Sequence, residues 1–394
     1  MPLFPANNWL ILLFSILSIA TIPVIFDRSS KTIFLLLLIP IYSFWKHAMV
    51  RETVIYYFQL IEFILFLWGI ILLASSPIKN KFIFLIPILS ICLFFSNAFS
   101  VDKDFRFDKN WNGYGNFSDS ILNYHQRMIT MTQISTKNVE RNKVKNDLKN
   151  LIGSNTIDIY PWDFSYIAAN NFNWQPRSTF QSIGLSKWAD KMTQSSFYRE
   201  NGPEFILFQS KKDTFGRELG SIDYRHLLNV EPLTNIQLFK NYDIVQNSKY
   251  FTIFQKNESN NLEAPKNLSS EVALWNEWID VPKTSNCILK LNFIAQKTLI
   301  GKITTLLYKD AQYVIDYQLK SGEILSYRFV PDIANNGIWI NPMLTSLKKG
   351  DPKDIVTQIR FKYQFLNNSK PQLNLNWVIY PIIKKETEGL FSFK

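Results

Sequence analysis

Polar and aromatic side chains gather in one stretch of this sequence, directly after a predicted strand over 156–160. The stretch, residues 158–182, reads DIYPWDFSYIAANNFNWQPRSTFQS. Open α/β sheets bind ligands at the carboxyl ends of their strands, so these side chains could hold a polar ligand over a floor of tryptophan rings. An internal salt bridge with aromatic packing uses the same residue types, and it is favoured because the stretch has no histidine or second base. The candidate ligand-binding residues are Trp162, Asp163, Trp174, Arg177 and Gln181.

A second polar group follows at Asp223, Arg225 and His226. A histidine beside an aspartate can act as a general base. Because no nucleophile can be assigned to it, a structural pair is the favoured interpretation. Asp223 and Arg225 remain candidate ligand-binding residues.

Four tryptophans lie in the last third of the chain, at positions 275, 278, 339 and 377. Flat rings on the face of a sandwich can contact the C–H face of a sugar. Trp278 and Trp339 are the candidates for such a platform, although most tryptophans in sandwiches belong to the core.

Metal ions and cofactors have no evident ligands in this sequence. It contains two cysteines, Cys92 and Cys287, and three histidines, and none of them form a spaced metal-binding cluster. Glycine-rich phosphate loops, the G-x-S-x-G elbow and H-E-x-x-H are also absent, so no cofactor is expected. The net charge of +11 is spread along the chain without a nucleic-acid-binding motif, so nucleic acid is not expected as a partner.

The elements that must position these residues fall into two patterns. Over 101–256 a connector is followed by predicted strands at 156–160, 204–209 and 250–255, with helical stretches at 164–171, 185–199 and 232–240, which is typical of a small α/β domain. After a polar linker at 257–270 the pattern changes to period two. Over 271–394 it predicts an antiparallel, jelly-roll-like β-sandwich with strands at 272–280, 287–296, 299–308, 312–319, 323–330, 355–365 and 372–382.

The first hundred residues are strongly apolar. Four runs, at about 9–26, 32–49, 54–75 and 82–99, approach the roughly 20 residues that a membrane-spanning helix requires. The predicted fold class is therefore a four-span membrane region, residues 1–100, followed by the α/β domain and the sandwich. Glu62 is an acidic residue inside the third run and could be functional or hydrogen-bonded to a neighbouring helix. The basic linkers at 27–31 and 76–81 favour both chain ends outside the cytoplasm.

The order of motifs in 158–208, with NGPEFILF at 201–208 and IDYR at 222–225, resembles the C-terminal region of bacterial polytopic GT-C-like membrane glycosyltransferases. The segment SYRFVPDIANNGIWINPML at 326–344 is similar too. The resemblance covers roughly residues 50–382. It implies a role in cell-envelope glycan transfer, a multi-pass inner-membrane location with extracytoplasmic soluble domains, and a polyprenyl-linked sugar, an envelope glycan, the lipid bilayer or other membrane subunits as partners.

The catalytic acid of those enzymes lies in a long first extracytoplasmic loop, whereas every linker between the four runs here is short. No catalytic residue can therefore be carried over, and whether the chain is an enzyme stays open. The chain is expected to act as a truncated relative that lacks the catalytic membrane core. The alternative is a non-catalytic, membrane-anchored module that binds a glycan or a protein.

Overall fold

The computed structural model describes residues 39–47, 50, 60, 63 and 119–383, with gaps at 183, 185, 210–218, 249, 309, 348–353 and 365–368. The chain divides into two compact units: residues 1–127 with 299–310, and residues 128–298 with 311–394. The second unit contains every candidate ligand-binding and sugar-platform residue. Glu62, the acidic residue of the third apolar run, lies outside the described residues.

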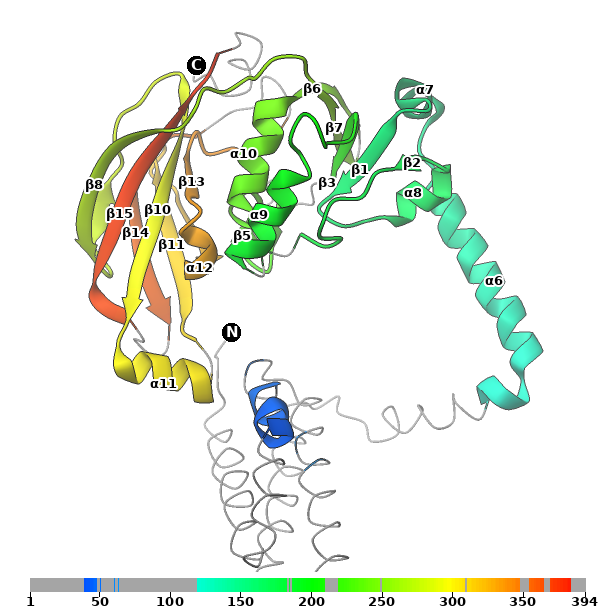
Figure 1. The fold of residues 1–394 in the computed structure, drawn as a ribbon, viewed down its shortest axis with the longest axis horizontal. Helices are drawn as coiled ribbons and strands as arrows, with labels where there is room; N and C mark the ends of the chain where they lie inside the picture. Colours follow the sequence, from blue (N-terminus) through cyan, green and yellow to red (C-terminus); the bar gives the residue numbers. More distant parts are fainter. Residues whose placement is uncertain are drawn as a thin grey trace, which may run out of the picture. The chain divides into compact units, whose positions relative to one another are not determined.

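A five-stranded mixed sheet forms the first half of this second unit (Figure 1). Its order is β2-β1-β3-β7-β6. Strands β2, β1 and β3 run parallel to one another, and β7 runs antiparallel to both of its neighbours, β3 and β6. Helices cover both faces, so the central strands are buried on both sides, as their continuous apolar sequences predict. The strands are β1 (Thr156–Tyr160), β2 (Asn173–Trp174), β3 (Phe205–Gln209), β6 (Tyr242–Asn247) and β7 (Phe251–Lys256).

Each face of the sheet has its own apolar core. On one face, α7 (Asn146–Ile152) and α8 (Ser165–Asn170) pack against Ile157 and Ile253. The other face packs against α10 (Pro232–Asn241), beside which lies α9 (Lys187–Ser195). The long helix α6 (Tyr124–Arg141) precedes α7 and has no buried residue.

The second half of the unit is a sandwich of two four-stranded antiparallel sheets, ordered β13-β10-β15-β8 and β12-β11-β14-β9. Along these strands apolar side chains alternate inward, and they form one core that includes Phe293, Tyr317, Phe361 and Trp377. The elements are β8 (Lys266–Leu274), β9 (Trp278–Asp280), β10 (Cys287–Lys297), β11 (Gln312–Leu319), β12 (Ile324–Phe329), α12 (Pro331–Ala334), β13 (Ile338–Asn341), β14 (Val356–Gln364) and β15 (Ser369–Pro381).

The two halves share a core. A single cluster joins Phe239 and Phe254 of the α/β half to Ile288, Trp339 and Ile382 of the sandwich half. Figure 1 shows α9 and α10 lying between the five-stranded sheet and the sandwich. The predicted linker 257–270 is also structured from Lys266, where β8 begins.

One predicted strand of the sandwich is wrong. Residues 299–308 contain a helix, α11 (Leu299–Leu307), which belongs to the first compact unit. Its last carbonyls accept hydrogen bonds from side chains of the helical segment 39–47, as Tyr42 Oη donates to Leu306 O at 3.0 Å and Trp45 Nε1 donates to Leu307 O at 2.6 Å. These bonds satisfy carbonyl groups that have no partner within the helix itself.

The membrane part of the predicted fold class also requires correction. Among the described residues, no helix combines the length and apolar character needed to cross a membrane. The 18-residue α6 carries Arg127, Lys137, Glu140 and Arg141, and α11 has only nine residues. Of the four apolar runs, 9–26 and 82–99 lie wholly outside the described residues, 32–49 is described over 39–47, and 54–75 is described at positions 60 and 63 alone. The predicted four-span region, with the multi-pass inner-membrane and extracytoplasmic location inferred from it, therefore loses its structural basis.

Candidate functional site

The first candidate site lies where β1 and β2 end. These strands pair in parallel, with Ile157 opposite Trp174, so their carboxyl ends meet at one edge of the sheet. The chain leaves β1 through the cis peptide bond between Tyr160 and Pro161 and returns past β2 through residues 175–182. The structure thus brings most of the predicted residues 158–182 to a single edge.

Arg177 is an anchor of this edge and does not face solvent. Its Nη1 atom lies 2.8 Å from Asp158 Oδ2, and both side chains are at most 1% exposed. The guanidinium also donates to the backbone carbonyls of Ile159 (2.5 Å), Pro161 and Phe180 (2.9 Å). A fully buried cation that is bonded to a carboxylate and to three backbone carbonyls fixes the two loops relative to β1. Arg177 therefore positions the site; its Nε atom is buried and has no hydrogen-bond partner among the described residues.

Three aromatic side chains cover this anchor. The ring centroids of Phe164, Trp174 and Phe180 lie 5.3–6.0 Å apart, and these residues are called the aromatic platform below. Trp174 and Phe180 are 37% and 58% exposed. Trp174 Nε1 donates to Asp158 Oδ1 at 3.0 Å, which fixes the indole ring on the same buried carboxylate that holds Arg177. The platform is thus an apolar surface that is open to solvent and rigidly supported.

Polar residues flank the aromatic platform in sequence: Asp163 precedes Phe164, and Gln181 follows Phe180. Asp163 is half-buried and accepts hydrogen bonds from Ser165 Oγ and from Gln209 Nε2 at 3.4 Å. Trp162, just before it, is 37% exposed, and Gln181 is exposed. Asp163 and Gln181 can offer an acceptor and an amide to a ligand that lies across the rings.

A buried carboxyl group lies beneath the same edge. Glu231 is 2% exposed, and Tyr160 Oη lies 3.4 Å from its Oε2 atom. Burial raises the pKa of Glu231 to about 7, against the lowering effects of nearby Ser182 and Arg177. Burial and the charge of Glu231 likewise raise the pKa of Tyr160 well above its usual value. Sequence reasoning missed Glu231, because a single glutamate before a proline gives no sign of its burial.

The second predicted group does not form a general base. Asp223 and Tyr224 have positive φ values and turn the chain between β4 (Ser221–Ile222) and β5 (Arg225–His226). The Asp223 carboxylate lies 2.5 Å from Arg328 Nη1 and 3.9 Å from Arg225 Nη2.

The other two members of this group are buried. The Arg225 guanidinium donates to Gly184 O at 3.0 Å, and burial lowers its pKa. His226 is 2% exposed, and its Nε2 atom lies 3.4 Å from Leu344 O. The geometry is that of a hairpin held against the sandwich.

The two candidate tryptophans of the sandwich have covered faces. Trp339 is 1% exposed, packs 5.5 Å from Phe239 and donates from Nε1 to Pro342 O. Trp278 is half-buried, and the guanidinium carbon of Arg360 lies 4.4 Å from its ring centroid. The exposed rings that lie together are instead those of the aromatic platform, at the edge of the α/β sheet.

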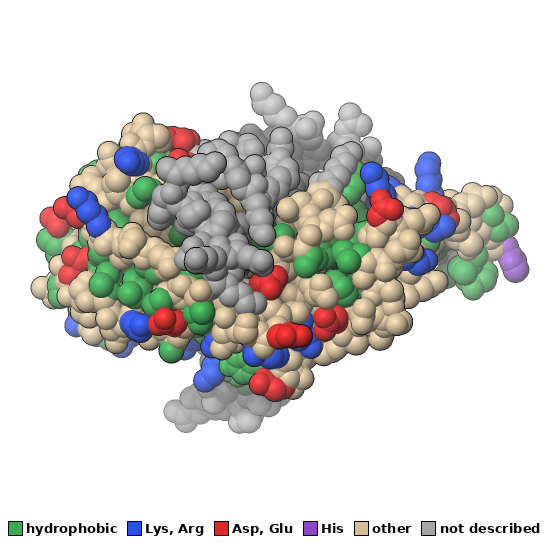
Figure 2. Space-filling view, turned by 90° about the horizontal axis from the view of Figure 1, so that it is seen from above, with side chains coloured by type: hydrophobic (Ala, Val, Ile, Leu, Met, Phe, Trp, Pro, Cys, Tyr) green, Lys and Arg blue, Asp and Glu red, His purple; other side chains and the backbone are tan. Residues whose placement is uncertain are grey.

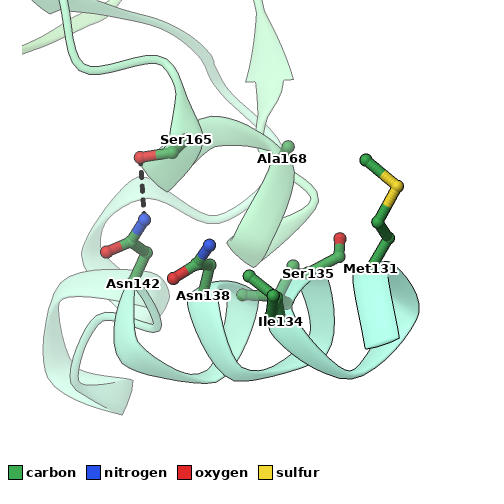
Figure 3. Close-up of a pocket in the computed structure, with 8 residues that line it drawn as sticks. Met131, Ile134, Ser135, Asn138, Asn142, Ser165 and Ala168 are labelled. Atoms are coloured by element: carbon green, nitrogen blue, oxygen red, sulfur yellow. Dashed lines mark hydrogen bonds between the residues drawn. The ribbon is translucent and has the colours of Figure 1, made fainter. Parts of the chain in front are cut away.

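A shallow groove of about 410 Å³ lies between α6 and α8 (Figure 3). Met131, Ile134 and Val139 of α6 contribute apolar surface, and Asn142 Nδ2 donates to Ser165 Oγ at 2.8 Å at one end. The residues that line the groove carry no ionisable side chain. The groove therefore has no group that could perform acid–base chemistry.

Metal binding finds no support in the described part of the chain, which holds no group of three or more histidine, cysteine, aspartate or glutamate side chains suited to a metal ion. Figure 2 shows acidic and basic side chains interspersed over one face of the molecule. The excess of positive charge is not gathered into one patch on that face.

Comparisons with known proteins identify no relative. No family model matches the sequence, no curated protein is similar to it, and no solved structure is similar to the fold.

Proposed function

We propose that this chain is a glycan-binding protein and that its ligand lies on the aromatic platform. The observation that carries the proposal is the group of three rings at the carboxyl end of the parallel strands, two of them substantially exposed. Soluble proteins normally bury aromatic side chains, so a grouped and exposed set points to a binding surface. The resemblance of residues 158–208 to glycosyltransferases of the cell envelope supports the same class of ligand.

Sugars fit this surface for a physical reason. An aromatic ring offers apolar contact to the C–H face of a pyranose, while hydroxyl groups at the ring's rim need polar partners. Asp163 and Gln181 are the chain neighbours of Phe164 and Phe180 and can supply an acceptor and an amide. Because Trp174 is already fixed by Asp158, little side-chain entropy is lost when a sugar stacks on it.

Binding alone, without transfer, is the activity we propose. Glycosyl transfer and hydrolysis both require a placed acid or base at the reacting atoms. Among the described residues of this edge, Asp163 is a carboxylate that reaches solvent, while Asp158 is fully buried against Arg177 and Glu231 is 2% exposed. The described residues around the platform thus provide a surface for stacking and a polar rim.

The test is a binding measurement on the full chain. Isothermal titration with a panel of soluble oligosaccharides should reveal a ligand, and Trp174→Ala with Phe180→Ala should weaken its affinity at least tenfold. Trp188→Ala is the matched control, because Trp188 is 68% exposed and lies at the far end of α9 beside the Lys187–Asp332 ion pair. An affinity that survives the double substitution unchanged would refute the proposal.

A further inference from the structure

One sheet of the sandwich presents amide side chains to solvent. In β15, the side chains of Leu373, Leu375 and Trp377 point into the core, so Gln372, Asn374 and Asn376 lie on the outer face. The same alternation puts Asn292 and Ile294 of β10 on this outer face.

The strand register aligns these residues in rows across the sheet. Asn374 pairs with Val272 of β8 on one side and with Ile294 of β10 on the other. Asn376 pairs in the same way with Ser270 and Asn292. Side chains in one row lie about 5 Å apart, which is the spacing of neighbouring strands. We call Gln372, Asn374, Asn376, Asn292, Val272 and Ile294 the amide strip.

Only part of this face is covered by the α/β half. At the row of Lys290, the lysine Nζ donates to Pro232 O at the start of α10 at 2.9 Å and to Asn336 O at 3.2 Å. Two rows further along, Val272 is 63% and Ile294 45% exposed. The amide strip therefore begins where the contact with α10 ends.

The strip contains no ionisable group, in contrast to the outer face of the other sheet. There, the buried Asp316 carboxylate lies 2.7–2.8 Å from Lys362 Nζ and Arg360 Nη2. On the amide strip, Ser270 Oγ donates to Asn376 Oδ1 at 2.9 Å, while the side chains of Asn374 and Gln372 form no hydrogen bond with the described residues. The nearest lysine on β15, Lys370, donates to Gln296 Oε1 at 2.8 Å at the margin.

We propose that the amide strip is a second sugar-binding surface and that it binds a neutral polysaccharide chain. Each amide can donate and accept, as a sugar hydroxyl also can, and Val272 and Ile294 offer apolar contact between the amides. A protein partner is disfavoured, because protein interfaces centre on aromatic and arginine anchors and the strip has neither. An anionic polymer would require the cations that the strip lacks. The inference shares its ligand class with the proposed function but uses a separate surface.

The experiment compares the native full chain with two double variants, one in the amide strip and one in the aromatic platform. The probes are soluble neutral polysaccharides (a glucan, a mannan and a xylan) and the anionic polymer polygalacturonate. Affinity electrophoresis should show that Gln372→Ala with Asn374→Ala weakens retardation by a neutral polymer at least fivefold. The matched control is Gln358→Ala on the outer face of the opposite sheet, where its amide bonds Asp280. Gln372 and Asn374 are exposed, so thermal unfolding of the strip variant should match that of the native chain.

The outcomes separate the two surfaces. A short oligosaccharide that occupies the aromatic platform should bind the strip variant as it binds the native chain, whereas Trp174→Ala with Phe180→Ala should lose it. Unchanged polymer binding by the strip variant overturns this inference. The proposal for the aromatic platform is then still tested separately, by oligosaccharide titration of Trp174→Ala with Phe180→Ala. Stronger retardation by polygalacturonate than by every neutral polymer also overturns it. If the native chain binds none of the polymers, the inference about the amide strip is overturned. The same result excludes a role of the aromatic platform in binding these polymers.

Discussion

At the residue scale, Glu231 should make stability depend on pH. Its pKa in the folded chain is raised from 4.5 to about 7 by burial, so its stabilising contribution is complete below pH 4.5 and is lost as the pH rises through 7. Since one pKa unit corresponds to about 1.4 kcal/mol, the free energy of unfolding should fall by roughly 3 kcal/mol over this pH range. Urea unfolding of Glu231→Gln and of the native chain should therefore diverge between pH 4.5 and 7.5 in favour of the variant. Parallel curves over this range would show that Glu231 does not titrate with the raised pKa.

The anchor residues show what a sequence can and cannot reveal at this scale. Asp158, Trp174 and Arg177 were grouped because they lie at the end of one predicted strand, 156–160, and in the segment after it; the short strand β2 that carries Trp174 was not predicted. An internal salt bridge was favoured for this segment, but the partner of Arg177 did not follow, because the residue types alone do not show that Arg177 is buried against Asp158. Burial of a charge depends on the packing of distant segments, which no local pattern contains.

At the element scale, Asp190 should stabilise the N-terminus of α10. Its carboxylate accepts hydrogen bonds from the backbone N–H groups of Leu233 (3.1 Å) and Thr234 (3.0 Å), which have no partner within α10. Asp190→Ala leaves the buried donor of Thr234 and the half-buried donor of Leu233 without that acceptor and should cost about 1–3 kcal/mol in the free energy of unfolding. Urea denaturation measures the change.

The control for Asp190 is Asp332→Ala. Asp332 forms an exposed ion pair with Lys187 at 3.6 Å, in which both side chains are more than half exposed. Exposed pairs contribute only about 0–1 kcal/mol, so this variant should differ little from the native chain. Equal losses in both variants would contradict the role of Asp190 at the start of α10.

Elements with a clear period were predictable, and short ambiguous ones were not. Alternation in 355–365 and 372–382 predicted strands that correspond to β14 and β15. Residues 299–308 were predicted as a strand, but a short apolar run rich in branched side chains suits a helix as well. In α11 the exposed residues Leu299, Ile303 and Leu306 recur at helical spacing, and this was the signal that could have decided the question. β13 has only four residues, all buried, and was missed for lack of length.

At the scale of the whole molecule, the α/β half and the sandwich half should unfold together. Two domains separated by a polar linker were predicted, yet Trp339 of β13 packs in one cluster with Phe239 of α10 and Ile288 of β10. Its backbone N–H also donates to Asn229 Oδ1 at 2.7 Å, so the sandwich is hydrogen-bonded to the α/β half at the same place. Such a shared core couples the stabilities of both halves.

Trp339→Ala tests this coupling. Removal of a large buried ring typically costs about 3–5 kcal/mol, and here the loss should lower the stability of both halves because both contact the ring. Far-ultraviolet and near-ultraviolet circular dichroism should report one coincident transition in the native chain and one in the variant, the latter at lower urea concentration. Trp188→Ala removes an exposed indole and should leave the midpoint nearly unchanged. A variant in which one half unfolds at the native midpoint while the other unfolds earlier would show that the halves are independent domains. In that case the amide strip and the aromatic platform would belong to separable modules, because neither the shared core nor the hydrogen bonds between the halves would couple their unfolding.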